Sequence, residues 1–137
     1  MALKFGVLAA AAVAFGGALA GVVAPASAFD PAAGDPTAGE KVFRKCQSCH
    51  AIGPEAKSKT GPALTGVVGR PAGKFEGYAY SPAMTKEAEA GLVWTPEKID
   101  AFLANPKKFL PGTKMTFAGL RKDQERADLI AYLAKFP

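Results

Sequence analysis

The stretch Cys46-Gln47-Ser48-Cys49-His50 holds both cysteines and the only histidine of the 137-residue chain. A structural zinc site needs four ligands, and these three residues supply too few. A thioredoxin-like redox pair normally follows a strand within a βαβ unit, and the sequence shows no such unit. A plain disulfide between Cys46 and Cys49, with a histidine at the surface, remains an alternative.

The same five residues have the spacing C-x-x-C-H, which is the attachment signature of c-type haem. At the end of a helix this spacing brings two thiols alongside the vinyl edges of a porphyrin, where each can form a thioether. The imidazole of the next residue then lies over the iron. The pattern therefore predicts one covalently bound haem c, attached through Cys46 and Cys49 and ligated by His50.

A second axial ligand cannot be a histidine, because His50 is the only one. It must be a methionine, a lysine, water or nothing. Beyond the start residue, the methionines are Met84 and Met115. Met84 falls in the first turn of a predicted short helix, where filling the core is the usual role. Met115 ends the turn Pro111–Met115, which can hold one side chain against a flat surface, so we expect Met115 to be the ligand.

The first 28 residues have the layout of a secretory signal. Lys4 precedes an uncharged, alanine- and glycine-rich run, and Ala26-Ser27-Ala28 is a cleavage motif of small residues. An uncleaved membrane anchor is the alternative, since the apolar run could just span a bilayer. We expect cleavage after Ala28, export to the periplasm, and one domain over residues 29–137. The formal net charge of +5 is far from the basic density of a nucleic-acid binder.

The remaining chain is predicted to be all-α, with short helices and long loops. Residues 29–34 form a loose lead. The first helix begins at Asp35-Pro36, or one register later through a Thr37/Glu40 capping box, and runs toward Cys46. Long loops are expected over 52–77 and 110–120, and a loop as long as the first needs something to order it. The other helices begin and end at the following pairs: Ser81 and Gly91, Thr95 and Asn105, Lys122 and Lys135.

From residue 37 to 137 the sequence resembles a class I cytochrome c, of the bacterial cytochrome c2 type close to mitochondrial cytochrome c. Several motifs carry the resemblance in order: Cys46–His50, Gly61-Pro62, Gly69-Arg70, Trp94, Asn105–Lys108, Pro111–Met115 and Asp128–Leu133. The resemblance implies the class I cytochrome c fold, with short helices and long loops around one haem. It also implies axial ligation by His50 and Met115.

Further roles follow from the resemblance alone. The Pro62 carbonyl should accept a hydrogen bond from His50 and fix its tautomer. Gly39 and Phe43 should pack on Leu129 and Tyr132, where two helices cross. The other residues expected to bind the haem are Arg70, Tyr80 and Trp94, around a propionate, and Thr113 in the Met115 turn.

Two positions depart from the mitochondrial pattern. Phe102 stands where those proteins have a tyrosine near the ligand sulfur, and Met84 stands where they have an asparagine. Both changes remove polar groups from the methionine side of the haem. The resemblance therefore predicts the two axial ligands of the iron more closely than it predicts the reduction potential.

An iron ligated on both faces by protein has no open site for a substrate, so we expect a one-electron carrier and not an enzyme. A haem enzyme or ligand sensor is the alternative, although a peroxidase would usually need a distal base. The resemblance implies a monomer that receives electrons from a quinol–cytochrome c reductase. Its acceptor would be a terminal oxidase, a photosynthetic reaction centre or another periplasmic protein. The lysines expected to ring the haem edge and to dock these partners are Lys45, Lys107, Lys108 and Lys114, with Lys59 and Lys122 near the opening.

Overall fold

The computed structural model describes residues 29–137, so the predicted signal segment and its cleavage lie outside the described residues. The prediction of an all-α chain is confirmed. Across residues 29–137 the only β-pairing is an isolated bridge between Pro71 and Val93. No helix within these residues is both long and apolar enough to cross a membrane. The elements are a 3-10 helix η1 (Pro31–Ala33) and helices α1 (Pro36–Phe43), α2 (Pro82–Glu89), α3 (Pro96–Ala104), α4 (Pro106–Phe109) and α5 (Asp123–Leu133).

Each of the first four α-helices begins at a proline that follows a capping side chain. A proline at the first helical position loses no hydrogen bond, and the preceding side chain accepts one from a free backbone N–H. For α1 the cap is Asp35, which accepts from the Thr37 N–H at 2.8 Å. The helix therefore begins at Pro36, and the alternative start one register later is wrong. The caps of α2, α3 and α4 are Ser81, Thr95 and Asn105.

Two short helices differ from the sequence-based expectation. The pair Asn105-Pro106 does end α3, as predicted, but the same pair also begins α4. Asn105 has an extended backbone and caps the new helix through the Lys108 N–H at 3.1 Å. The lead before α1, predicted to be loose, contains η1, because the Asp30 side chain caps a single turn.

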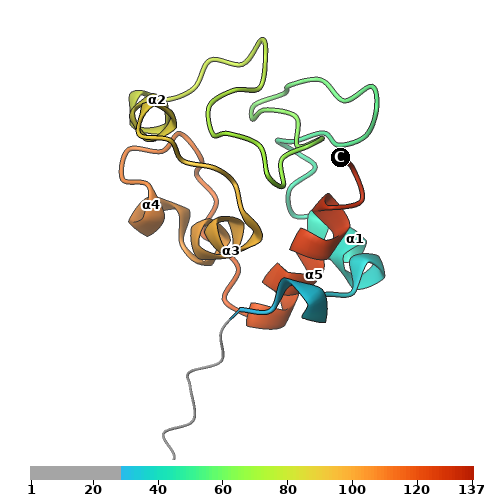
Figure 1. Cartoon of the computed structure of the whole chain (residues 1–137). Coiled ribbons are helices and arrows are strands. Elements are labelled where there is room, and N and C mark those ends of the chain that lie inside the picture. Colours follow the sequence, from blue (N-terminus) through green and yellow to red (C-terminus); the bar gives the residue numbers. More distant parts are fainter. Residues whose placement is uncertain (1–28) are drawn as a thin grey trace, which may run out of the picture.

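Helices α1 and α5 cross closely, and together they form one side of the molecule in Figure 1. A methyl group on Gly39 would collide with the Asp128 carbonyl oxygen and come within 2.7 Å of the Tyr132 Cβ. The rings of Phe43 and Tyr132 lie 5.4 Å apart. The predicted packing of α1 on α5, with a glycine at the crossing, is confirmed.

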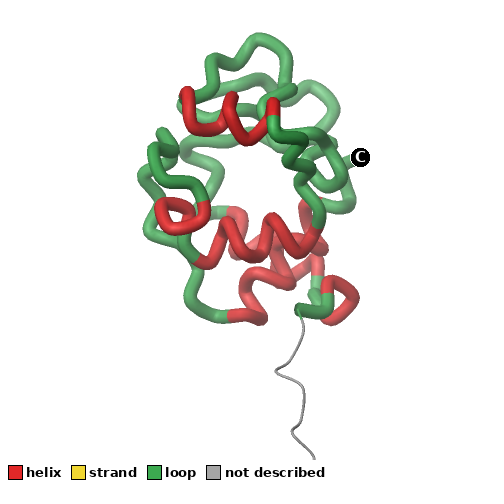
Figure 2. Tube along the Cα trace, turned by 60° about the vertical axis from the view of Figure 1, so that its left-hand side comes forward, coloured by secondary structure: helices red, strands yellow, loops and turns green. Residues whose placement is uncertain are grey.

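The long loop over residues 52–77 is tied to the segment that leads into α3. Backbone hydrogen bonds join Gly69 and Arg70 to Trp94, at 2.8 and 2.9 Å, and Ala72 to Leu92 at 2.8 Å. Figure 2 shows the loops and helices arranged as a ring, with α2 opposite the pair α1 and α5. Segments far apart in the sequence therefore lie on different sides of the ring.

Candidate cofactor site

A cavity of about 380 Å³ lies between these segments. Its volume is in the range of ligand pockets, roughly 300–1,000 Å³. Its walls come from the end of α1, the loop at 60–70, helices α2, α3 and α5, and the segment around Met115. The cavity collects every site residue that the sequence predicted: Cys46, Cys49, His50, Pro62, Arg70, Tyr80, Trp94, Thr113 and Met115.

The two cysteines reach the cavity because α1 continues as a run of turns. The Cys46 N–H donates to the Phe43 carbonyl at 2.8 Å, and the His50 N–H donates to the Cys46 carbonyl at 2.9 Å. Both thiols are free. Burial raises the pKa of Cys46 to about 11, so this thiol is protonated at neutral pH.

The His50 imidazole is held directly. Its Nδ1 lies 2.7 Å from the Pro62 carbonyl oxygen, which can only accept, so the proton is on Nδ1 and Nε2 keeps the lone pair. The hydrogen bond expected from the resemblance is therefore present. Burial lowers the pKa of His50, which keeps the ring in the neutral form that binds a metal. Gly61 packs against the ring, because a methyl there would lie 2.8 Å from Nδ1 and collide with Cε1.

The Met115 side of the cavity is held through its backbone. The Thr113 hydroxyl accepts from the Met115 N–H at 3.2 Å, and the Thr113 N–H donates to the Leu110 carbonyl at 3.0 Å. Gly112 has φ of +87°, a conformation that the turn requires and that favours glycine. Met84, which is buried in α2, lines the same cavity. Position in the cavity wall therefore does not show which of the two methionines is the axial ligand.

Arg70 and its neighbours form the polar part of the wall. Arg70 donates to the carbonyl oxygens of Thr65, at 2.8 Å, and Ala63, at 3.3 Å. Within residues 29–137, no carboxylate pairs with it. Burial lowers the pKa of Arg70 and raises the pKa of Tyr80. An unpaired, half-buried guanidinium in the wall is suited to an anionic group of a ligand.

Aromatic side chains form the apolar part. The Trp94 ring lies 5.1 Å from the Phe102 ring and 6.1 Å from the Phe109 ring. Trp94 is buried and contacts the core. Trp94 and Phe102 line the cavity, and Phe109 packs behind them, so the wall next to α3 is largely apolar and suits an apolar ring system.

These residues fit a covalently bound haem. Two thiols adjoin a neutral imidazole, a thioether lies on a distant segment of the same cavity, and the Arg70 guanidinium, which has no carboxylate partner among residues 29–137, can donate to a propionate. The zinc alternative is not supported, because no group of three or more metal-binding His, Cys, Asp or Glu side chains occurs among residues 29–137.

The sequence reasoning missed Tyr78, which also lines the cavity. Its hydroxyl donates to the Thr60 carbonyl at 3.0 Å, and its ring lies 5.6 Å from the Lys114 ammonium. Lys114 in turn donates to the Ala79 carbonyl at 2.7 Å. A single tyrosine in a loop shows no periodicity or spacing, so nothing in the sequence marks these contacts.

The lysines expected to ring the haem edge differ in whether their ammonium groups already have partners within the protein. Lys45 forms an ion pair with Glu125 at 2.9 Å, which the sequence analysis did not foresee. Lys59 donates to the Gln47 carbonyl, and Lys114 is engaged as described above. Lys107 and Lys108 are exposed and form no ion pair within residues 29–137.

Comparison with known proteins decides the family. The family model for cytochrome c matches residues 36–136. The chain belongs to the cytochrome c family. It is 52% identical over 100 residues to cytochrome c2 of Agrobacterium tumefaciens (strain II Chrys), covering 73% of this chain and 90% of that protein. It is 48% identical over 118 residues to cytochrome c2 of Blastochloris viridis, covering 86% and 87%.

A solved structure agrees with the sequence comparison. Cytochrome c2 from Rhodospirillum centenum superposes with a TM-score of 0.71 at 48% identity, over 75% of this chain and 98% of that one. The class I cytochrome c fold and the likeness to the cytochrome c2 type are confirmed. Proteins of the cytochrome c family hold haem c covalently and carry electrons, and they are not enzymes.

Proposed function

We propose that this cytochrome c holds one haem c, attached through Cys46 and Cys49 and ligated axially by His50 and Met115. One observation carries the proposal. The cavity receives both cysteines and His50 from the end of α1, and Met115 from a segment far along the chain. The haem would supply one-electron exchange at its iron, and a His/Met pair favours a raised reduction potential.

The protein residues prepare this chemistry in three ways. The Pro62 carbonyl fixes the His50 proton on Nδ1 and leaves Nε2 for the iron. Arg70 offers its unpaired charge to a propionate. The apolar side chains of Trp94 and Phe102 would limit the access of water to the haem, and strong ligands on both faces would keep the iron geometry similar in its two oxidation states.

The proposed place of action is the periplasm, where the monomer would carry electrons from a quinol–cytochrome c reductase. The acceptor would be a terminal oxidase, a photosynthetic reaction centre or another periplasmic protein. The secretory layout of residues 1–28 and the likeness to cytochromes c2 support this proposal. Haem attachment needs Cys46 and Cys49 reduced, and both thiols are free in the fold.

Expression of the full chain with its first 28 residues tests this proposal. We expect an exported protein that begins at Phe29, carries the mass of one haem and takes up one electron per molecule. A replacement of Cys46 and Cys49 together by alanine should abolish the covalent haem. An exported protein without haem, in which Cys46 and Cys49 form a disulfide, would contradict the proposal.

Docking on the reductase and the acceptor is proposed to use the lysine-rich haem edge. Lys107 and Lys108 should contribute most, because their charges are exposed and unpaired among the described residues. Lys45 should contribute less, since Glu125 partly neutralises it. Exposed charges steer the encounter with an acidic partner, and salt screens them over a Debye length of about 8 Å at physiological ionic strength.

The second-order rate of electron transfer with an acidic reductase or oxidase measures this docking. The rate should fall steeply as salt is added, and Lys107→Glu should slow it far more than Lys135→Glu, which changes the net charge equally. A flat salt response, or equal slowing by the two variants, would contradict the docking proposal.

A further inference from the structure

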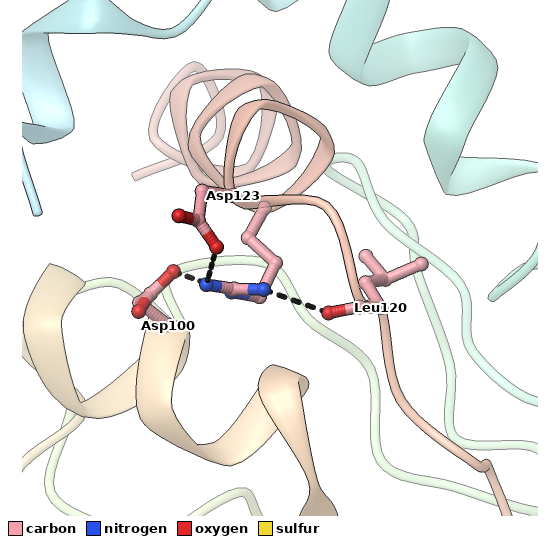
Figure 3. A network of polar contacts seen from close by, with 4 residues as sticks. Asp100, Leu120 and Asp123 are labelled. Atoms are coloured by element: carbon pink, nitrogen blue, oxygen red, sulfur yellow. Dashed lines mark hydrogen bonds and ion pairs between the residues drawn. The ribbon is translucent and has the colours of Figure 1, made fainter.

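Arg126 is a buried charge on α5 with 8% of its surface exposed. Figure 3 shows one guanidinium, that of Arg126, facing oxygen atoms of Asp100, Leu120 and Asp123, of which the last two belong to the segment that leads into α5 and to its first turn. Nε donates to Asp100 of α3 at 2.7 Å, Nη1 donates to the Leu120 carbonyl at 2.8 Å, and Nη2 donates to Asp123 at 2.6 Å. These three hydrogen bonds offset the free-energy cost of burying the positive charge of Arg126.

Leu120 ends the segment that carries Met115. This segment leaves α4 at the buried Leu110 and returns to the core at the buried Leu120. The Leu120 N–H donates to the Leu103 carbonyl at 2.8 Å, while its carbonyl accepts from Arg126. Both backbone groups of Leu120 are therefore bound, one to α3 and the other to α5.

The three oxygens differ in how much they depend on Arg126. Asp123 has 91% of its side chain exposed, so water replaces a lost contact there at little cost. Asp100 is only 16% exposed, and the hydrogen bond to the Leu120 carbonyl is buried. Loss of the guanidinium would leave that carbonyl without its buried donor, which costs more than the bond itself contributes.

We propose that Arg126 is a positioning residue for Met115, because it fixes the end of the Met115 segment against α5. The proposal rests on the proposed ligation of the iron by Met115. Arginine is required because its planar group presents donors in several directions at once, whereas lysine is a single point of charge. Without Arg126 the segment should move away from the cavity more often, and Met115 should be displaced more easily.

Imidazole binding to the ferric, haem-loaded protein measures this displacement, since imidazole competes with Met115 for the iron. Arg126→Lys should tighten imidazole binding about tenfold, which corresponds to about 1.4 kcal/mol. Asp100→Asn should tighten it by a smaller factor, and Asp123→Asn should leave it unchanged. The order of these three variants follows the burial of the contacts that each one removes or weakens, since asparagine can still accept a hydrogen bond but carries no charge.

A matched control separates positioning from a general loss of stability. Ile130 is buried in α5 and does not line the cavity. Ile130→Val or Ile130→Ala, whichever matches the loss of Tm in Arg126→Lys, should leave imidazole affinity unchanged. Equal imidazole affinities in Arg126→Lys and this control would overturn the proposal. If Arg126→Lys does not fold, Asp100→Asn takes its place, and an affinity equal to the wild type would then overturn it.

The failure of this proposal can be told apart from a failure of the proposed ligation. A wild-type ferric spectrum without a methionine–iron charge-transfer band would refute ligation by Met115, and positioning with it. A normal band in the wild type, with no difference between Arg126→Lys and its control, would refute only the role of Arg126.

Discussion

The two sides of the cavity hold their proposed ligands differently. The His50 ring is held directly: its Nδ1 forms a 2.7 Å hydrogen bond with the Pro62 carbonyl, and the ring packs against Gly61. Met115 is held through its segment, by the Thr113 hydroxyl near it and by the contacts of Leu120 beyond it. The histidine side is therefore a local structure, whereas the methionine side depends on how α3 and α5 pack. Loosening of the core should release the methionine before the histidine.

Gly61→Ala should have the largest effect, because it damages the histidine side. The new methyl collides with the His50 ring, so the ring must move and lose the Pro62 hydrogen bond. We expect a loss of about 3 kcal/mol in the free energy of unfolding, as overpacking and a broken buried hydrogen bond combine. Denaturation of the haem-loaded protein by urea measures this loss.

Gly77→Ala is the control for that experiment. Gly77 has φ of +74° and nothing near its Cβ position, so alanine there adds backbone strain without a collision. Strain of this kind costs about 1–2 kcal/mol. A loss in Gly61→Ala no larger than in Gly77→Ala would show that His50 is not held as tightly as its contacts indicate.

Phe102→Tyr should have an intermediate effect, on the methionine side. Phe102 and Met115 line the same cavity, and Phe102 is fixed between the rings of Trp94 and Phe109. A phenol that donates to the Met115 sulfur withdraws electron density and disfavours the ferric state. The reduction potential should rise by tens of millivolts, which is what one hydrogen bond of about 1 kcal/mol gives.

Potential and thermal stability should be measured on the same Phe102→Tyr protein, since a buried hydroxyl without a partner lowers stability. An unchanged or lowered potential, in a folded protein that keeps its methionine–iron band, would show that Phe102 does not face the Met115 sulfur.

Lys45→Gln should have the smallest effect, because the ion pair with Glu125 lies at the surface. The hydrogen bond from Lys45 lowers the pKa of Glu125 from its ordinary value of 4.5. A lowered carboxylate pKa stabilises the fold above that ordinary value, and the contribution is lost as the pH falls through the folded pKa. The difference in Tm between wild type and Lys45→Gln should be present at pH 7 and vanish in strong acid. A difference that persists in strong acid would rule out the ion pair as its source.

The helix starts and the cysteine–histidine motif could be predicted because their causes are local. A capping side chain followed by proline fixes where a helix begins, and C-x-x-C-H places three ligating groups within five residues. The start of α4 was missed for a related reason. Asn105-Pro106 ends one helix and caps the next, and the sequence pattern was interpreted only as an end.

The contacts that could not be predicted join residues far apart in the sequence. Lys45 and Glu125 are 80 positions apart, and Arg126 and Asp100 are 26 apart. Charged residues in a helix are usually solvated, yet Arg126 and Asp128 are buried beside Leu129 and Ile130. Only the crossing of α5 with α1 and its packing on α3 brings their partners within reach, and no spacing in the sequence expresses that packing.

The central claim is that His50 and Met115, and not Met84, ligate the iron. The ferric spectra of Met115→Ala and Met84→Leu test it most directly, because both methionines line the cavity and each variant removes one sulfur. We predict that Met115→Ala loses the methionine–iron charge-transfer band and that Met84→Leu keeps it. A band that survives in Met115→Ala and disappears in Met84→Leu would contradict the claim.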